Sequence, residues 1–373
     1  MSVLKKTGKA LADVIPGLGR LTFDTNIGTV FITSGTGVIG YRVALSLLEA
    51  GHKSVRVGIW KGDRELGPGA EDKAFAENIT TLLESKGATV INFDWSDKGC
   101  YKEALSGVKT VFCTLPHMDE WASVFPAWLK ACKETKVEHF VKISFLRNQA
   151  GDEYRKNVPF VKFHSTCDDL LEHAPNSSRI SYTILCTSHI MATPLLHQGK
   201  VLTEEHKYVT ASYGMGVNYV SPNDVADAAL VVLLNQKGHR NKVYNLTGPG
   251  PIFDKDVAKL LSKAYGTEIE HYSLGYHDYK KTVKARGLPN WLIRDSAAFE
   301  KMKASGIDEL NSSYTNDIEK ITGHRPESFA DYLGNKNAQR PGRMFGNCVP
   351  VTVNLITELR DGSVSSSTLK LSS

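Results

Sequence analysis

The sequence predicts an α/β fold built on a doubly wound parallel sheet that carries helices on both faces. Three observations support this prediction. Short apolar runs alternate with amphipathic stretches through residue 186, a glycine cluster follows the first apolar run, and the 373 residues, 41% of them hydrophobic, can bury a large core. At about 100 to 200 residues per domain, this length fits one large domain or two.

The strands and helices are predicted in order from this alternation. Six apolar runs predict strands, at residues 29–33, 54–60, 88–94, 110–115, 139–144 and 181–186. Helical patterns fill the intervals between them, at residues 41–53, 71–87 and 121–136. Beyond residue 186 we expect a helix that begins near Ser221, Asn223 or Asp224, then the strand "KVYNLTG" and the helix "DKDVAKLLSKAYG". Residues 267–335 are predicted to be mainly helical.

Both ends of the chain differ from the part between them. Residues 1–27 form an N-terminal extension ahead of the first strand, and residues 336–373 form a C-terminal tail. The tail contains two runs of β-branched residues around Asp361 and Gly362, which predicts a β-hairpin that docks on a protein partner or on the domain itself. A disordered terminus is the alternative.

Composition excludes several classes of function. The formal net charge is +5, without a basic run that alternates with aromatic residues, so we expect no nucleic-acid partner. The six cysteines include no C-x-x-C pair, so the sequence indicates neither a metal site nor a disulfide framework. No run of 18 apolar residues and no secretory signal are found, so we expect no transmembrane segment and a cytoplasmic protein. A mitochondrial presequence in "KKTGKAL" is the alternative.

The glycine cluster lies between a predicted strand and a predicted helix. Gly35, Gly37 and Gly40 match G-x-G-x-x-G in the context that gives this motif its meaning. The glycines permit a tight turn and a close approach of the backbone to a ligand. The helix N-terminus beyond them offers free N–H groups to a pyrophosphate. The sequence therefore predicts a dinucleotide site, with a glycine-rich turn that binds no ligand as the alternative.

The order of these segments resembles the NmrA-like proteins, a branch of the atypical short-chain dehydrogenases/reductases. The resemblance covers roughly residues 28–335 and is carried by "ITSGTGVIGYRVALSLLEAGHKSVRV", "INFDWSDKGCYKEALSGVKTVFCTLP", "KVEHFVKIS", "SYTIL", "YVSPNDVADAALVVLL", "KVYNLTGPGPI" and "EKITGHRPESFADYL". It implies one NAD(P)-binding Rossmann domain with a smaller mixed α/β lobe built from segments after about residue 187. The usual motif of the family, G-x-x-G-x-x-G, puts Ser34 in the first glycine slot. Serine fits there only if its φ angle is negative.

The resemblance also implies the residues that contact the cofactor. The turn would hold the pyrophosphate, the end of the third strand would flank the adenine, and the end of the fourth would line the nicotinamide. These positions are Ser34, Gly35, Thr36, Gly37, Ile39 and Gly40, then Asp94 and Trp95, then Thr114, Leu115 and Pro116. Near the end of the second strand, Lys61 would select the 2′-phosphate of NADP, although Asp63 would favour NAD.

The catalytic dyad expected from the resemblance is missing. Short-chain dehydrogenases usually donate a proton from a tyrosine with a lysine four residues later, but here the two slots hold Phe160 and His164. His164 is the candidate general acid, or alternatively a residue that packs beside the cofactor. The Y-x-x-x-K at Tyr276 lies too far along the chain to replace the dyad. His189 is expected at the wall of a substrate pocket or in the core.

Two functions follow from these observations. The missing tyrosine and the tail favour a dinucleotide-binding protein with little carbonyl reductase activity, which acts as a redox sensor or as a scaffold in an assembly. The alternative is an NADPH-dependent oxidoreductase of a quinone or another small carbonyl acceptor. A flat acceptor of this kind takes hydride without a strong acid beside it.

Overall fold

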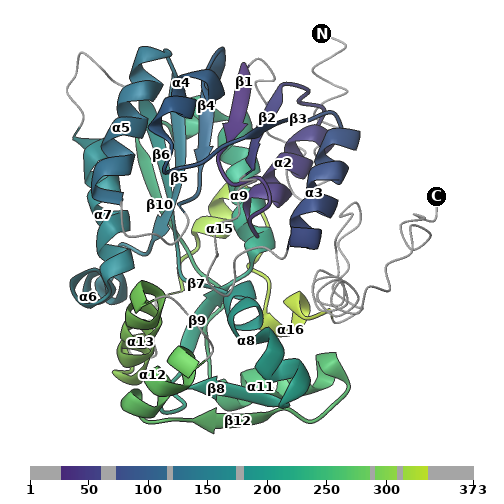
Figure 1. The fold of residues 1–373 in the computed structure, drawn as a ribbon, viewed down its shortest axis with the longest axis vertical. Coiled ribbons are helices and arrows are strands. Elements are labelled where there is room, and N and C mark those ends of the chain that lie inside the picture. Colours follow the sequence, from purple (N-terminus) through teal and green to yellow (C-terminus); the bar gives the residue numbers. More distant parts are fainter. Residues whose placement is uncertain are drawn as a thin grey trace.

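The computed structural model describes residues 27–59, 73–115, 121–173, 180–285, 290–308 and 314–334. The predictions for Lys61, Pro116, the N-terminal extension and the C-terminal tail lie outside these residues. The described chain forms a large sheet with helices on both faces and a small lobe at one end of that sheet (Figure 1). No described helix is long and apolar enough to cross a membrane.

The large sheet has seven parallel strands in the order β10-β6-β5-β4-β1-β2-β3. The order reverses between β1 and β4, which is the point where such sheets bind ligands beyond their carboxyl ends. The predicted fold class is therefore confirmed. The strands are β1 (Thr29–Ile32), β2 (Val55–Ile59), β3 (Thr89–Asn92), β4 (Val108–Cys113), β5 (His139–Phe145), β6 (Ser181–Thr187) and β10 (Lys242–Leu246).

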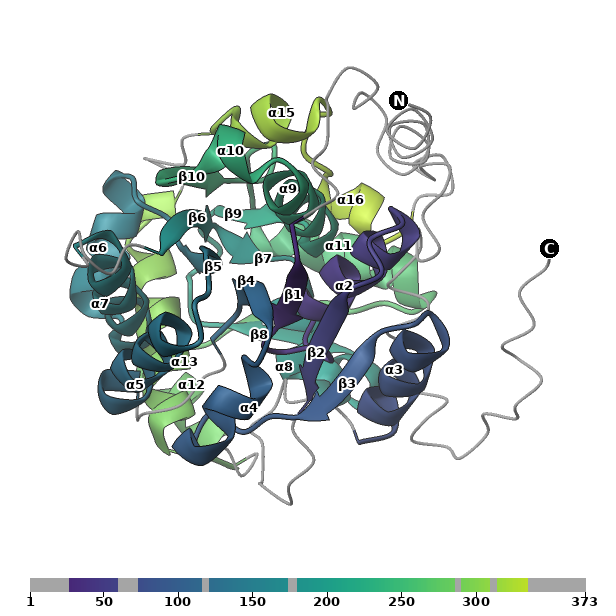
Figure 2. The ribbon, with the colours of Figure 1, turned by 90° about the horizontal axis from the view of Figure 1, so that it is seen from above.

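Alternation along the strands divides the core into two layers. In β1, Val30 and Ile32 face one layer and Phe31 faces the other, because successive side chains point to opposite faces of a sheet. Figure 2 shows α2, α3 and α9 on one face and α4, α5 and α7 on the other. These helices are α2 (Gly40–Glu49), α3 (Lys73–Ser85), α4 (Tyr101–Ala104), α5 (Trp121–Glu134), α7 (Pro159–Glu172) and α9 (Pro222–Leu234).

Helix α9 is the most deeply buried helix of the sheet domain. Every residue from Pro222 to Leu234 is buried, as expected for a helix that is apolar on nearly all sides. Its N-cap is Ser221, whose hydroxyl accepts the N–H of Asn223 at 3.1 Å. The shorter helices of this domain are η2 (Lys98–Cys100), α6 (Gln149–Asn157), α10 (Gln236–His239) and α15 (Asp317–Thr322).

The small lobe begins where β6 ends, so it lies beyond the carboxyl edge of the large sheet (Figure 1). It has its own core. Its strands are β7 (His189–Ile190), β9 (Val217–Val220) and β11 (Pro251–Ile252) in one sheet, with β8 (Lys207–Thr210) and β12 (Glu270–Ser273) in another. Its helices are α8 (Ala192–Glu204), α11 (Asp254–Tyr265), α12 (Tyr276–Ala285), α13 (Asn290–Ala304) and α16 (Phe329–Tyr332). Strand β12 departs from the helical prediction for residues 267–335, because its polar sequence EHYS contains no apolar run.

Two glycines set the packing of the first strand–helix unit. A Cβ atom at Gly40 would lie 1.8 Å from the carbonyl oxygen of Ser34, and one at Gly35 would lie 1.7 Å from Cγ1 of Val57. The first contact brings the start of α2 against the end of β1, and the second brings the turn against β2. Neither position has room for a side chain.

We predict that Gly40→Ala lowers the free energy of unfolding by about 1 to 3 kcal/mol, the usual cost of overpacking a tight contact. The control is Gly275→Ala, because no atom lies within 4 Å of a Cβ at that position. Urea unfolding followed by circular dichroism measures both variants. Equal midpoints for Gly40→Ala and the unmodified protein would show that the turn adjusts freely.

Candidate functional site

The ends of β1 and β4 are tied together at the point where the strand order reverses. The Thr33 N–H donates to the carbonyl of Phe112 at 3.1 Å, and the Thr33 hydroxyl donates to the carbonyl of Thr114 at 3.1 Å. The same hydroxyl accepts the Thr114 N–H at 3.2 Å. Thr114 is half-buried and Leu115 is buried in the core. The structure therefore brings the glycine turn and Thr114, two predicted parts of the site, side by side.

The turn from Ser34 to Gly40 is held in shape by backbone hydrogen bonds and leads into an uncapped helix. The Gly35 N–H donates to the carbonyl of Gly58 at 2.9 Å, and the Gly37 N–H donates to the carbonyl of Ser34 at 3.2 Å. Helix α2 then starts with Ile39 as N-cap, without a side-chain cap and without an acidic residue in its first turn. Such an N-terminus favours a negatively charged group. These features fit a dinucleotide pyrophosphate.

The residue in the first glycine slot meets its backbone condition. Among the described non-glycine residues, positive φ angles occur only at Lys136, His206, Tyr213 and Asn241. Ser34 therefore has a negative φ, as a serine at this position requires. Thr36, also predicted in the site, is buried with 3% of its surface exposed.

The residues predicted beside the adenine lie at the carboxyl end of β3. Asp94 is half-buried, and its carboxylate accepts the Ser96 N–H at 2.8 Å. Trp95 is 6% exposed, and its ring packs 5.1 Å from Phe93 and 5.2 Å from Trp128, centroid to centroid. Most of the indole thus belongs to the aromatic core under the sheet edge. Its contact with adenine stays a prediction.

His164 lies on α7 beside a buried ion pair. The Lys142 ammonium of β5 donates to Oδ1 of Asp168 at 2.7 Å and to Nδ1 of His164 at 3.2 Å. The side chains of Lys142 and Asp168 are completely buried. Because Nδ1 of His164 accepts a hydrogen bond, the neutral ring carries its proton on Nε2. The role of His164 as general acid stays a prediction.

The carboxylate of Asp168 has three partners on β5 and just beyond it. Besides Lys142, it accepts the Ser144 hydroxyl at 2.6 Å and pairs with the Arg147 guanidinium at 3.0 Å. Arg147 also pairs with Glu172 at the end of α7. The sequence analysis missed this network, although a lysine inside the apolar run "HFVKIS" was a signal that a carboxylate partner lies opposite.

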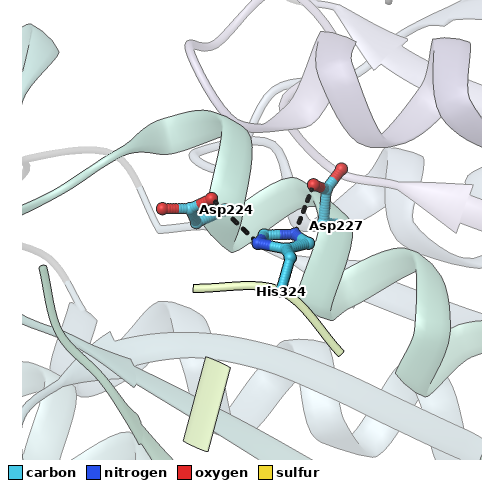
Figure 3. A group of neighbouring side chains, drawn as sticks. All are labelled: Asp224, Asp227 and His324. Atoms are coloured by element: carbon cyan, nitrogen blue, oxygen red, sulfur yellow. Dashed lines mark hydrogen bonds and ion pairs between the residues drawn. The ribbon is translucent and has the colours of Figure 1, made fainter. Parts of the chain in front are cut away.

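A second charged group joins α9 to the chain after α15. Asp224, Asp227 and His324 place their ligand atoms within 4.8 Å of one another, as a metal site would require (Figure 3). However, Nε2 of His324 lies 3.0 Å from Asp227, and Nδ1 lies 2.9 Å from the carbonyl of Arg325. Both distances are those of hydrogen bonds, so the imidazole joins Asp227 of α9 to the backbone at Arg325. These contacts hold α9 against the chain after α15.

This second group is connected to the start of α2. Asp224 accepts the Glu327 N–H at 2.6 Å, and the Glu327 carboxylate accepts the Asn223 amide at 3.0 Å. The Asn223 amide oxygen then accepts Nε of Arg42 at 2.9 Å, and Arg42 also donates to the carbonyl of Val38 in the glycine turn. The network holds the helix that follows the turn against α9. Sequence spacing did not predict it, because its members come from three distant segments.

One protein family and several known proteins are similar to this chain over most of its length. A model of the NmrA-like family matches residues 26–333. The chain is 27% identical over 316 residues to prestalk A differentiation protein A of Dictyostelium discoideum, covering 82% of this chain and 91% of that protein. It is 25% identical over 304 residues to quinone oxidoreductase 2 of Escherichia coli, covering 81% and 96%.

A solved structure shows the same fold. It is the NADPH-dependent quinone oxidoreductase of Escherichia coli in complex with NADPH, which matches with a TM-score of 0.65 at 21% identity and covers 83% of this chain and all of that one. The family model extends over both the sheet domain and the small lobe. The chain therefore belongs to the NmrA-like family, whose members share the NAD(P)-binding Rossmann-type fold.

Proposed function

We propose that the protein is an NADPH-dependent oxidoreductase that reduces a quinone or another small carbonyl acceptor. The observation that carries the proposal is the glycine turn at the reversal of strand order. There Gly35 and Gly40 leave no room for side chains, and α2 begins without a cap. The relatives support a redox role, since quinone oxidoreductase 2 aligns over nearly its full length.

A quinone suits the residues at the usual position of the dyad. Phe160 occupies the slot of the tyrosine and has no proton to donate, and its ring lies 4.6 Å from that of His164. Hydride transfer to an ordinary ketone produces an alkoxide, a base about as strong as hydroxide. Hydride transfer to a quinone produces a phenolate-type anion, for which tyrosine with a pKa of about 10 is the model. The quinone therefore needs a weaker acid.

A redox sensor that works through a thiol has less support. A thiol sensor needs an exposed cysteine with a lowered pKa. Burial instead raises the pKa of Cys167 and of Cys186 to about 12, and it also raises the pKa of Cys113 and Cys132. Cys100 is half-buried, and its pKa is raised as well, chiefly by burial. No described thiol is therefore activated for redox sensing.

We predict that the protein oxidises NADPH in the presence of quinones and reduces simple ketones and aldehydes about a hundredfold to ten-thousandfold more slowly, because general acid catalysis contributes that much. The loss of NADPH absorbance across a panel of acceptors measures this. Gly37→Val should abolish NADPH binding and turnover together, whereas Gly275→Ala should retain both. Tight NADPH binding without reduction of any quinone would favour the scaffold function, and full affinity in Gly37→Val would place the cofactor elsewhere.

We predict a preference for NADP(H) that depends on Lys61. A charge-assisted contact with the 2′-phosphate contributes about 1.5 to 3 kcal/mol, so Lys61→Ala should weaken NADPH binding about tenfold to a hundredfold and leave NADH binding unchanged. The exposed Lys53 provides the control variant Lys53→Ala. Calorimetric titration of both cofactors decides the question. Tighter binding of NADH than of NADPH would instead implicate Asp63.

We predict that Cys186 resists alkylation in the folded protein. A rise in its pKa from 9.0 to about 12 reduces the thiolate fraction about a thousandfold. Iodoacetamide labelling with peptide mass spectrometry should modify Cys100 first among the described cysteines. In urea all of them should react. Rapid labelling of Cys186 in the folded protein would instead support a redox sensor that works through this thiol.

A further inference from the structure

Three polar side chains meet where the small lobe joins the large sheet. The Tyr154 hydroxyl of α6 lies 3.0 Å from Nε2 of His189 in β7, and it donates a short hydrogen bond to Asp308 in the segment after α13. His189 and Asp308 are themselves 3.6 Å apart, Nε2 to Oδ2. Figure 1 shows β7 at the side of the lobe that faces the large sheet. Strand β6 ends at Thr187, two residues before His189, and Thr187 pairs with Phe145 of β5.

Packing holds this group in one arrangement. Tyr154 is completely buried, Asp308 is 1% exposed, and the side chain of His189 is 10% exposed. The imidazole packs against the rings of Phe145 and Phe299, with centroids at 5.5 and 5.6 Å, and these two rings also contact each other at 6.0 Å. His189 is thus the least buried member of the group.

The hydrogen bonds define where the protons lie. A carboxylate only accepts, so the Tyr154 O–H points to Asp308, and the tyrosine oxygen accepts the Nε2–H of His189. Burial, with Asp308 beside it, raises the pKa of Tyr154 well above its ordinary value, so the tyrosine stays a neutral hydroxyl. Within the described part of the chain, no group bonds Nδ1 of His189.

One carboxylate faces the imidazole directly. Asp308 lies 3.6 Å from Nε2, whereas Glu300 of α13, which acts electrostatically on Tyr154, is paired with Lys303 at 2.6 Å. Tyr219 of β9 lies 6.0 Å from the imidazole, centroid to centroid, and is kept neutral because burial raises its pKa. The described groups that contact the ring therefore include one negative charge and no positive one.

We propose that His189 is the proton donor of the reaction, with Tyr154 and Asp308 as positioning residues. This inference rests on the proposed function. In a doubly wound sheet the dinucleotide lies outside the carboxyl ends of the strands, and its second half lies over the strands after the reversal, which here are β4, β5 and β6. His189 follows β6 by one residue, at that edge, whereas Nδ1 of His164 is held by Lys142.

The proposed step balances as follows. Bound NADPH would supply a hydride, with two electrons, and the quinone would become the hydroquinone monoanion. The Nδ1–H bond of the His189 imidazolium would then break, and the proton would form an O–H bond on the anionic oxygen. The products are NADP⁺, the quinol and a neutral imidazole whose proton remains on Nε2 toward Tyr154. Water then returns a proton to Nδ1.

His189→Gln tests the donor role and should lower kcat about a hundredfold or more with NADPH affinity unchanged. His173→Gln, at an exposed histidine, is the matched control and should retain activity. In the unmodified protein kcat/KM should fall at alkaline pH, because the reaction requires a protonated His189. Asp308→Asn should move this fall to lower pH, since the carboxylate no longer stabilises the imidazolium.

If His189→Gln fails to fold, Tyr154→Phe serves as the second variant, because it keeps the aromatic ring in place. Nitrogen NMR of the protein without cofactor gives a second readout: the Nε2–H form of His189 should dominate at alkaline pH and should lose that dominance in Tyr154→Phe. Quinone turnover by folded His189→Gln within about twofold of the unmodified protein would overturn this inference alone. Dominance of the Nδ1–H form of His189 at alkaline pH in the unmodified protein would also overturn it. Absence of turnover in the unmodified protein would overturn the proposed function, and the donor role with it.

Discussion

The contact between the backbone of Gly40 and the carbonyl of Ser34 is the constraint on which the rest of the site depends. It fixes the first turn of α2 directly over the end of β1. Thr33 then ties that end to β4, and Arg42 ties the helix to α9. The turn is therefore shaped by contacts on three sides within the protein. A pyrophosphate would meet N–H groups that are already oriented, with little ordering left to accomplish on binding.

The small lobe completes what the sheet domain begins. The sheet supplies the turn, the helix N-terminus and the ends of β3 and β4, all suited to a dinucleotide. The lobe places β7 across the carboxyl edge of β5 and β6, with an imidazole among aromatic rings. Although α7 lacks the expected tyrosine, this edge of the sheet still has titratable groups. In the proposed reaction, the position of the proton donor depends on how the two parts meet.

Sequence reasoning predicted the features that are encoded locally. Apolar runs, the glycine spacing and the helix start near Ser221, Asn223 or Asp224 each depend on a few neighbouring residues, and the parallel sheet follows from the alternation of strands and helices. It did not predict contacts such as Lys142 with Asp168, 26 residues apart, or Tyr154 with His189. No period in the chain links those positions, because they meet only after the helices dock. Trp95 shows the related limit, since a position after a strand does not reveal how much of the ring is buried.

The buried pair of Lys142 and Asp168 restricts how this sequence can change over time. Both side chains have no exposure, and Ser144, Arg147 and His164 share their hydrogen bonds. Loss of Asp168 would leave the Lys142 ammonium without a counter-charge in the core, which is far more costly than the loss of both charges, whereas loss of Lys142 would leave Asp168 paired with Arg147. In related sequences, a neutral residue at position 168 is therefore expected only together with a neutral residue at position 142. In an alignment of close relatives, the two positions should stand out as a covarying pair that joins β5 to α7.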